Sequence, residues 1–318
     1  MNLTRVSPAV FNHSHTAADV EVSSSADGAC VQLLRPYQPE QAFSSLVLSA
    51  NLAPHADGCA LLEVQVEQDG QWSPFYKIGM LAHSFKQSFP AQQDVCGQVA
   101  VDELQLAKPA QRYRCRIQLE GNTFLDRLTT CGVCAPFVYD EAFATQLPAG
   151  EVQIPVGALS QKEQNLADKD RICSPVSLCM ALQALGQRVT LAQVLEGVYD
   201  ATYDIYGNWM FNVAFAAQCG VEAEVARFSS LRQLQDTCTP CSLVIASVAY
   251  QPGELPHAAQ PQTPGHLVLV RGYENEKILV ADPAAPHAGE VLRAYEAKAF
   301  ARAWLCNKQG VAYVLRKK

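Results

Sequence analysis

Short segments in which apolar and polar residues alternate dominate the chain from residue 29 to about residue 135. In the segment 112–119 every second residue is apolar and its neighbours are arginine or glutamine, which is the period of a strand with one buried face. Asp69-Gly70 separates two such segments and is a hairpin signal. Strands recurring in this way without a long helical pattern favour an antiparallel β-sandwich.

The second half of the chain has a different order, with helical patterns first and strand patterns after them. This order is typical of an α+β domain. Prolines and glycines punctuate the segment 144–161, so we expect one domain at 1–148 and a second at 149–318. The expected helices cover 174–186, 190–200 and 210–220, and the expected strands cover 241–250, 265–273 and 277–283.

Composition limits the classes of function. The chain has 318 residues, of which 49% are hydrophobic and 17% charged, enough to build two buried cores. Its net charge of -7, with no basic run except the last three residues, argues against a nucleic-acid or anionic-membrane partner. We find no secretion signal in the first 25 residues and no apolar run of about 18 residues. The 12 cysteines lack the spacing of a small disulfide scaffold, so we expect a cytoplasmic protein, with export by another route left open.

One cysteine stands where the first expected helix begins. Pro175 is tolerated in a first helical turn and disfavours helical angles at Ser174, so the helix should start at about 174 or 175. Cys173 then lies at the N-terminal end, where free amide groups and the positive helix end favour the thiolate. The alternative is a buried thiol that packs as a small apolar residue, as we expect for Cys179.

A histidine and an aspartate lie at the open end of a predicted hairpin. If the turn centres on Glu274, His266 and Asp282 face each other with Cβ atoms about 4.5–5.5 Å apart. The aspartate could then orient the imidazole in a thiol-based triad. A slip of one residue would separate the pair, and Asp282 could instead be an Asp-Pro turn former. We expect no catalytic role for the other histidines, His13, His15, His55, His83, His257 and His287.

An acyl-transfer site also needs donors for the oxyanion. The backbone amide of Cys173 can supply one. Gln161 and Gln164, in the loop that leads to Cys173, are both candidates for the second.

Five short motifs follow one another in the second half: Ser160-Gln161, Cys173-Ser174-Pro175-Val176-Ser177, Gly207-Asn208-Trp209, Gly265-His266 and Ala281-Asp282-Pro283. In this order they resemble the bacterial cysteine peptidase-like family related to the bacteriocin-processing double-glycine peptidases, a branch of the papain clan. The resemblance implies a papain-like domain with Cys173 as nucleophile, His266 as general base and acid, and Asp282 as the orienting residue. It also implies Gln161, rather than Gln164, as the oxyanion donor.

The segments 43–79 and 92–104 are similar to the β-sandwich that precedes the peptidase domain in some of these bacterial proteins. Such relatives often carry an export signal, which we do not find here. Together the features predict a hydrolase, a cysteine peptidase or amidase acting on a peptide or amide substrate through an acyl-enzyme. Asn208, Trp209 and Gly265 are candidate substrate-binding residues, although Trp209 could equally be a core anchor. The sandwich could recognise a glycan or peptide.

Other interpretations remain open. The same site could pass the acyl group to an amine or thiol, as in transglutaminase-like or phytochelatin-synthase-like relatives. The chain could also be a binding protein without activity. Two Cys-x-x-Cys pairs, Cys131/Cys134 and Cys238/Cys241, have zinc-site spacing, but one lies in each expected domain, far beyond the spacing of compact zinc motifs. We therefore expect no metal and no cofactor.

Overall fold

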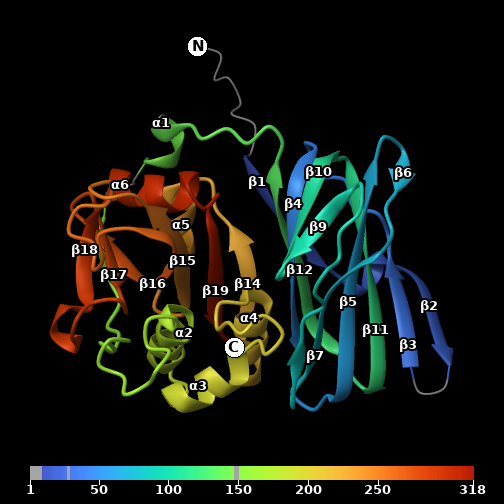
Figure 1. The fold of residues 1–318 in the computed structure, drawn as a ribbon, viewed down its shortest axis with the longest axis horizontal. Coiled ribbons are helices and arrows are strands. Elements are labelled where there is room, and N and C mark those ends of the chain that lie inside the picture. Colours follow the sequence, from blue (N-terminus) through green and yellow to red (C-terminus); the bar gives the residue numbers. More distant parts are fainter. Residues whose placement is uncertain (1–8, 27–28, 147–149) are drawn as a thin grey trace.

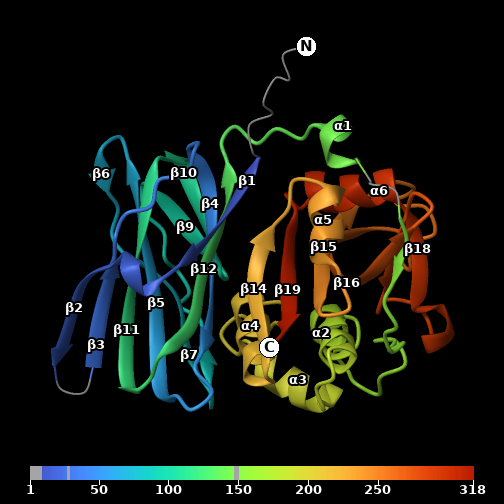
Figure 2. The same ribbon diagram turned by 180° about the vertical axis from the view of Figure 1, so that it is seen from behind.

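The computed structural model describes residues 9–26, 29–146 and 150–318. These residues form an N-terminal unit of two packed sheets and a C-terminal unit of helices and one sheet, which lie side by side (Figure 1). Figure 2 shows the same arrangement from behind, with β14 and α4 of the C-terminal unit facing the sandwich. The expected boundary at residue 148 lies outside the described residues.

Two antiparallel sheets build the N-terminal sandwich. The first has the order β1 (Val10–His15), β12 (Leu125–Cys134), β4 (Phe43–Leu52), β10 (Glu103–Ala110) and β9 (Gly97–Ala100). The second has the order β2 (Val20–Ala26), β3 (Ala29–Leu34), β11 (Arg112–Asn122), β5 (Asp57–Gln68), β7 (Tyr76–Ala82) and β8 (Lys86–Gln87), with β6 (Gln71–Trp72) paired to β5. The short helix η1 (Ala17–Asp19) links β1 in the first sheet to β2 in the second.

The alternating pattern that predicted the sandwich is confirmed in β11. Tyr113, Cys115, Ile117 and Leu119 are buried between the sheets. Asp69-Gly70 forms the turn between β5 and β6, and both residues have positive φ angles, as a two-residue hairpin turn requires.

The C-terminal unit begins with helices and ends with strands, as expected, although antiparallel sheets make up most of the described structure. Its sheet has the order β14 (Val221–Arg227), β19 (Val311–Lys317), β15 (Ser242–Tyr250), β16 (Thr263–Glu274), β17 (Lys277–Ala281) and β18 (Leu292–Glu296), with β13 (Val152–Gln153) paired to β16. The helices are α1 (Glu141–Ala144), α2 (Cys173–Ala184), α3 (Leu191–Val198), α4 (Trp209–Gln218), α5 (Leu231–Thr237) and α6 (Ala297–Ala301). Two further helical turns, η2 (Ala288–Glu290) and η3 (Arg302–Cys306), lie before and after α6. Within the described ranges, no helix has the length and apolar character needed to cross a membrane.

Side chains of the sandwich cover the edge strand β14. Asn51 donates to the carbonyl of Ala223 at 2.7 Å and accepts from its amide at 3.1 Å. Asn12 makes the same pair of bonds with Arg227, and Ser49 accepts from the amide of Val225 at 3.0 Å. These side chains take the place of a neighbouring strand, so the edge of the C-terminal sheet is satisfied by the N-terminal unit.

The start of α4 is anchored in the sandwich as well. The carboxylate of Asp102 accepts from the backbone amides of Trp209 and Met210. Met210 and Phe211 belong to the apolar core of the sandwich. Helix α4 therefore joins the two cores and fixes the C-terminal unit against the N-terminal one.

Candidate active site

The helix that carries Cys173 is buried almost all round. Residues 174–182 of α2 are buried, and the helix ends before Gly186, whose φ of 91° suits a glycine. The helix starts at Cys173, one or two residues earlier than the proline predicted, because Pro175 is accommodated within the first turn. Cys173 is half-buried at the N-terminal end of α2, whereas Cys179 is fully buried inside the core.

His266 lies on β16, next to the first turn of α2. The residue is 2% exposed. The hydroxyl of Ser177 in α2 donates to the carbonyl of Leu267 at 3.0 Å, which ties the helix to the strand directly beside His266. The position of Cys173 relative to the imidazole is thus set by a buried bond between their two elements.

The electrostatics of this pair favour a charged thiolate. Burial by itself raises the pKa of the Cys173 thiol, but a hydrogen bond and charge attraction from His266 outweigh it, and the resulting pKa is lowered. Burial likewise lowers the pKa of His266, yet Asp282 and Cys173 raise it to about 10. These shifts favour a thiolate beside an imidazolium over a thiol beside a neutral imidazole.

Asp282 holds the far side of the imidazole. His266 Nε2 lies 2.7 Å from Asp282 Oδ1, which also accepts from the amide of Ala284 at 2.9 Å. The other oxygen, Oδ2, accepts from the hydroxyl of Tyr295 at 2.6 Å. Burial raises the pKa of Asp282, but the charge of His266 and these hydrogen bonds lower it overall. The carboxylate is thus ionised and fixed in orientation.

β16 and β17 form the expected hairpin that brings His266 and Asp282 together, but the predicted register of their pairing is wrong. The turn is the two-residue loop Asn275-Glu276, with both φ angles positive, rather than a turn centred on Glu274. Val270 therefore pairs with Val280 instead of residue 278, and a bulge shifts the pairing again before Gly272. The shift of two positions near the open end keeps His266 and Asp282 on one face as diagonal neighbours, and long side chains bridge that distance.

Gln161 is held beside the segment that carries Asp282. Its backbone amide donates to the carbonyl of Pro283 at 2.8 Å, and the hydroxyl of Ser160 donates to the carbonyl of Ala285 at 2.6 Å. The Gln161 side chain is buried, and its Oε1 has no hydrogen-bond partner. The side-chain amide of Gln164, by contrast, donates to the backbone carbonyl of Ser160 at 2.7 Å, within the same loop.

Comparison with known proteins gives a family match in each of the two units. Residues 153–311, half of the chain, match the Peptidase_C39 like family, and residues 32–135 match a Peptidase C39 N-terminal domain. The chain belongs to the Peptidase_C39 like family. A solved structure of a C39-like peptidase from Bacillus anthracis covers 54% of this chain and 99% of its own, at 17% identity and a TM-score of 0.39. A vicilin from hazelnut, Corylus avellana, covers 97% of this chain and 84% of its own, at 12% identity and a TM-score of 0.13. The search of curated proteins gave no match.

In this C39-like chain, two of the three expected substrate-binding residues lie at the boundary between the units. Asn208 is fully buried, caps α4 by accepting from the amide of Phe211, and donates to Ser88 and Asp200. Trp209 follows it as the first residue of α4 and is partly buried against the C-terminal core. Gly265 is exposed and directly precedes His266. Of the three, only Gly265 adjoins His266 along the chain.

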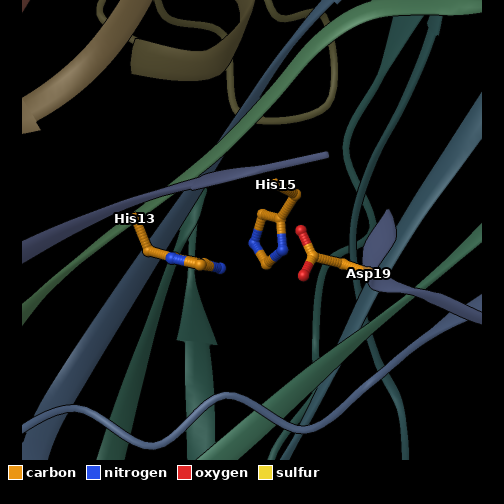
Figure 3. Close-up of side chains that lie close together, drawn as sticks. All are labelled: His13, His15 and Asp19. Atoms are coloured by element: carbon orange, nitrogen blue, oxygen red, sulfur yellow. The ribbon is translucent and has the colours of Figure 1, made fainter. Parts of the chain in front are cut away.

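Two features of this C39-like chain went unnoticed in the sequence. Tyr295 has no motif of its own, and only the pairing of β18 with β17 places its hydroxyl near Asp282. Three side chains of types that can ligate a metal, His13, His15 and Asp19, converge in the sandwich (Figure 3). Among the described residues, neither Cys-x-x-Cys pair belongs to such a group.

Proposed function

We propose that this member of the C39-like family is a cysteine peptidase that cleaves a peptide or amide bond through Cys173, His266 and Asp282. The observation that carries the proposal is the buried chain of contacts from the helix-start thiol through His266 to Asp282, with the pKa of Cys173 lowered and that of His266 raised. A papain-like arrangement of nucleophile helix and histidine strand forms part of the proposal.

Each residue has a defined step. The thiolate of Cys173 attacks the amide carbonyl, and the imidazolium of His266 gives its proton to the leaving nitrogen as the C–N bond breaks. His266 then takes a proton from water as the water oxygen attacks the thioester carbonyl, the C–S bond breaks to release the acid, and the thiolate–imidazolium pair is restored. Asp282 keeps the imidazole in one orientation throughout, since its Oδ1 accepts from Nε2 and leaves Nδ1 for the thiol.

Stabilisation of the oxyanion is assigned to the amide of Cys173 and the side chain of Gln161. Gln161 is favoured because it is buried and its backbone amide is bonded to Pro283. The side-chain amide of Gln164 is already used in a hydrogen bond to Ser160. Such donors contribute on the order of a hundredfold or more to the rate. The exposed Gly265 is proposed to line the substrate groove next to His266.

The compartment is also part of the proposal. All 12 cysteines are free, and the fold uses several of them as buried apolar residues. Unpaired thiols persist in a reducing environment, so we propose a cytoplasmic location.

The direct test is cleavage of a peptide library, followed by mass spectrometry, with the full chain and with Cys173→Ala. Cys241→Ala is the matched control, because it removes an exposed thiol. We expect cleavage by the wild type and the control and none by Cys173→Ala or His266→Ala. Cleavage that persists in Cys173→Ala would overturn the proposal, as would a wild type that neither cleaves nor reacts with a peptide carrying a thiol-directed electrophile. Addition of an amine acceptor separates hydrolysis from acyl transfer by the products.

A further inference from the structure

The sandwich contains a group of side chains that the peptidase site does not use. His13 and His15 are two residues apart on β1, so they point to the same side of this edge strand. Asp19 is the last residue of η1, the short helix that connects β1 in the first sheet to β2 in the second. Figure 3 shows the three side chains directed toward one another, with the carboxylate of Asp19 beside the ring of His15.

The ligand atoms of these residues are close enough for one ion. One atom from each of the three lies within 4.8 Å of the others. Metal–ligand distances of about 2.0–2.2 Å in a tetrahedral zinc site place two ligand atoms roughly 3.4 Å apart. Small side-chain rotations would therefore close the group around an ion without moving the backbone.

Each side chain is already oriented by a second contact. The Oδ2 atom of Asp19 accepts from the amide of Thr16 at 2.7 Å and from its hydroxyl at 2.9 Å, so neither of these bonds uses Oδ1. The ring of His13 stacks on Tyr37 with centroids 3.8 Å apart. His15 Nε2 lies 2.6 Å from the hydroxyl of Thr130, so Nδ1 keeps its lone pair when Nε2 donates. Outer contacts of this kind orient metal-binding residues in known sites.

The donor types of the group also suit a divalent cation. Each imidazole offers a nitrogen lone pair and the carboxylate offers an anionic oxygen.

We propose that His13, His15 and Asp19 bind one divalent transition-metal ion of the zinc class, and that the ion joins β1 to the crossover between the two sheets. Two imidazoles and one carboxylate are ligands that zinc takes, with a fourth position left open. A cavity of about 380 Å³, lined by His15 and Thr16 among others, adjoins the group on the side of His15. Cys115 Sγ lies 3.9 Å from Nε2 of His15, but Cys115 does not belong to the group of converging ligand atoms.

The test uses the full chain with Cys173→Ala, which removes the reactive thiol, after treatment with a chelator. Binding of Co²⁺ is followed by its visible spectrum, and Zn²⁺ affinity by competition with a chromogenic chelator. Three further variants are compared in this background. His13→Phe keeps the stack on Tyr37 but removes the ligand atom, Asp19→Asn keeps an acceptor for Thr16 but removes the charge, and His55→Ala removes an exposed histidine elsewhere in the sandwich.

We expect one ion per chain, a cobalt spectrum without the intense near-ultraviolet band of thiolate ligands, and a higher melting temperature with Zn²⁺. Affinity should fall at least tenfold in His13→Phe and in Asp19→Asn and stay unchanged in His55→Ala. Unchanged affinity in both of the first two variants, a thiolate band, or no binding at millimolar Zn²⁺ would overturn the proposal. The melting temperature without metal shows that each variant is folded.

Discussion

The hydroxyl of Tyr295 donates to Oδ2 of Asp282 at 2.6 Å, on the carboxylate oxygen opposite the one that contacts His266. Tyr295 is fully buried on β18, and Asp282 directly follows β17, the strand that pairs with it. The carboxylate is therefore held from both sides, and rotation about its side chain would cost both hydrogen bonds. Tyr295 acts as a positioning residue for the proposed triad.

Tyr295→Phe should lower kcat about tenfold or more and leave KM within about twofold. A hydrogen bond to a charged group is worth about 1.5–3 kcal/mol, and the phenyl ring keeps the packing. Steady-state kinetics and the alkylation rate of Cys173 at pH 7 measure the effect. Tyr199→Phe is the matched control, because it removes an exposed hydrogen bond from a tyrosine to Asp204, which is not part of the proposed triad. Equal kinetics for the two variants would refute a positioning role.

Ser177→Ala should loosen the contact between α2 and β16. It removes the buried bond to the carbonyl of Leu267, so we expect a loss of about 1–2 kcal/mol in the free energy of unfolding and slower labelling of Cys173 at neutral pH. Ser230→Ala removes the cap of α5 and should cost about 1 kcal/mol without changing that labelling. Urea denaturation and thiol labelling give both quantities. Slower labelling in both variants would attribute the effect to general destabilisation.

Asn51→Ala should weaken the junction between the two units. It leaves the amide and carbonyl of Ala223 without partners in a buried place, so we expect a loss of about 2–3 kcal/mol in urea denaturation. Asn12→Ala breaks the same pair of bonds at Arg227, but Asn12 is exposed and water can replace it, so its loss should be smaller by about 1 kcal/mol or more. Equal losses would show that side-chain capping of β14 does not depend on burial.

Local patterns were sufficient to predict the elements that carry the proposed triad. The helix start at Cys173 follows from Pro175, and the hairpin that carries His266 and Asp282 follows from two apolar runs around a turn. The register was wrong because the turn type depends on the positive φ angles of Asn275 and Glu276, neither of which is the glycine that signals such a turn.

Contacts between distant segments could not be predicted. The bond from Tyr295 to Asp282 depends on the pairing of β18 with β17, and the bond from Asn208 to Ser88 depends on docking of the sandwich against α4. In both cases the partner is fixed by tertiary packing, which leaves no periodic trace in the sequence. His13, His15 and Asp19 are close in sequence, but no local pattern predicts the turn through η1 that brings Asp19 back to the histidines.

The central claim is that Cys173 is a thiolate paired with His266. The test is the pH dependence of iodoacetamide labelling at each cysteine, read by peptide mass mapping, in the wild type and in His266→Ala, with exposed Cys241 as internal reference. Because the pKa of Cys173 is lowered and that of His266 is raised to about 10, the ion pair persists between these two values. Labelling of Cys173 should therefore extend to lower pH than labelling of Cys241, and should move to higher pH in His266→Ala, where burial alone acts on the thiol. Labelling of Cys173 that follows Cys241 and does not respond to His266→Ala would contradict the account.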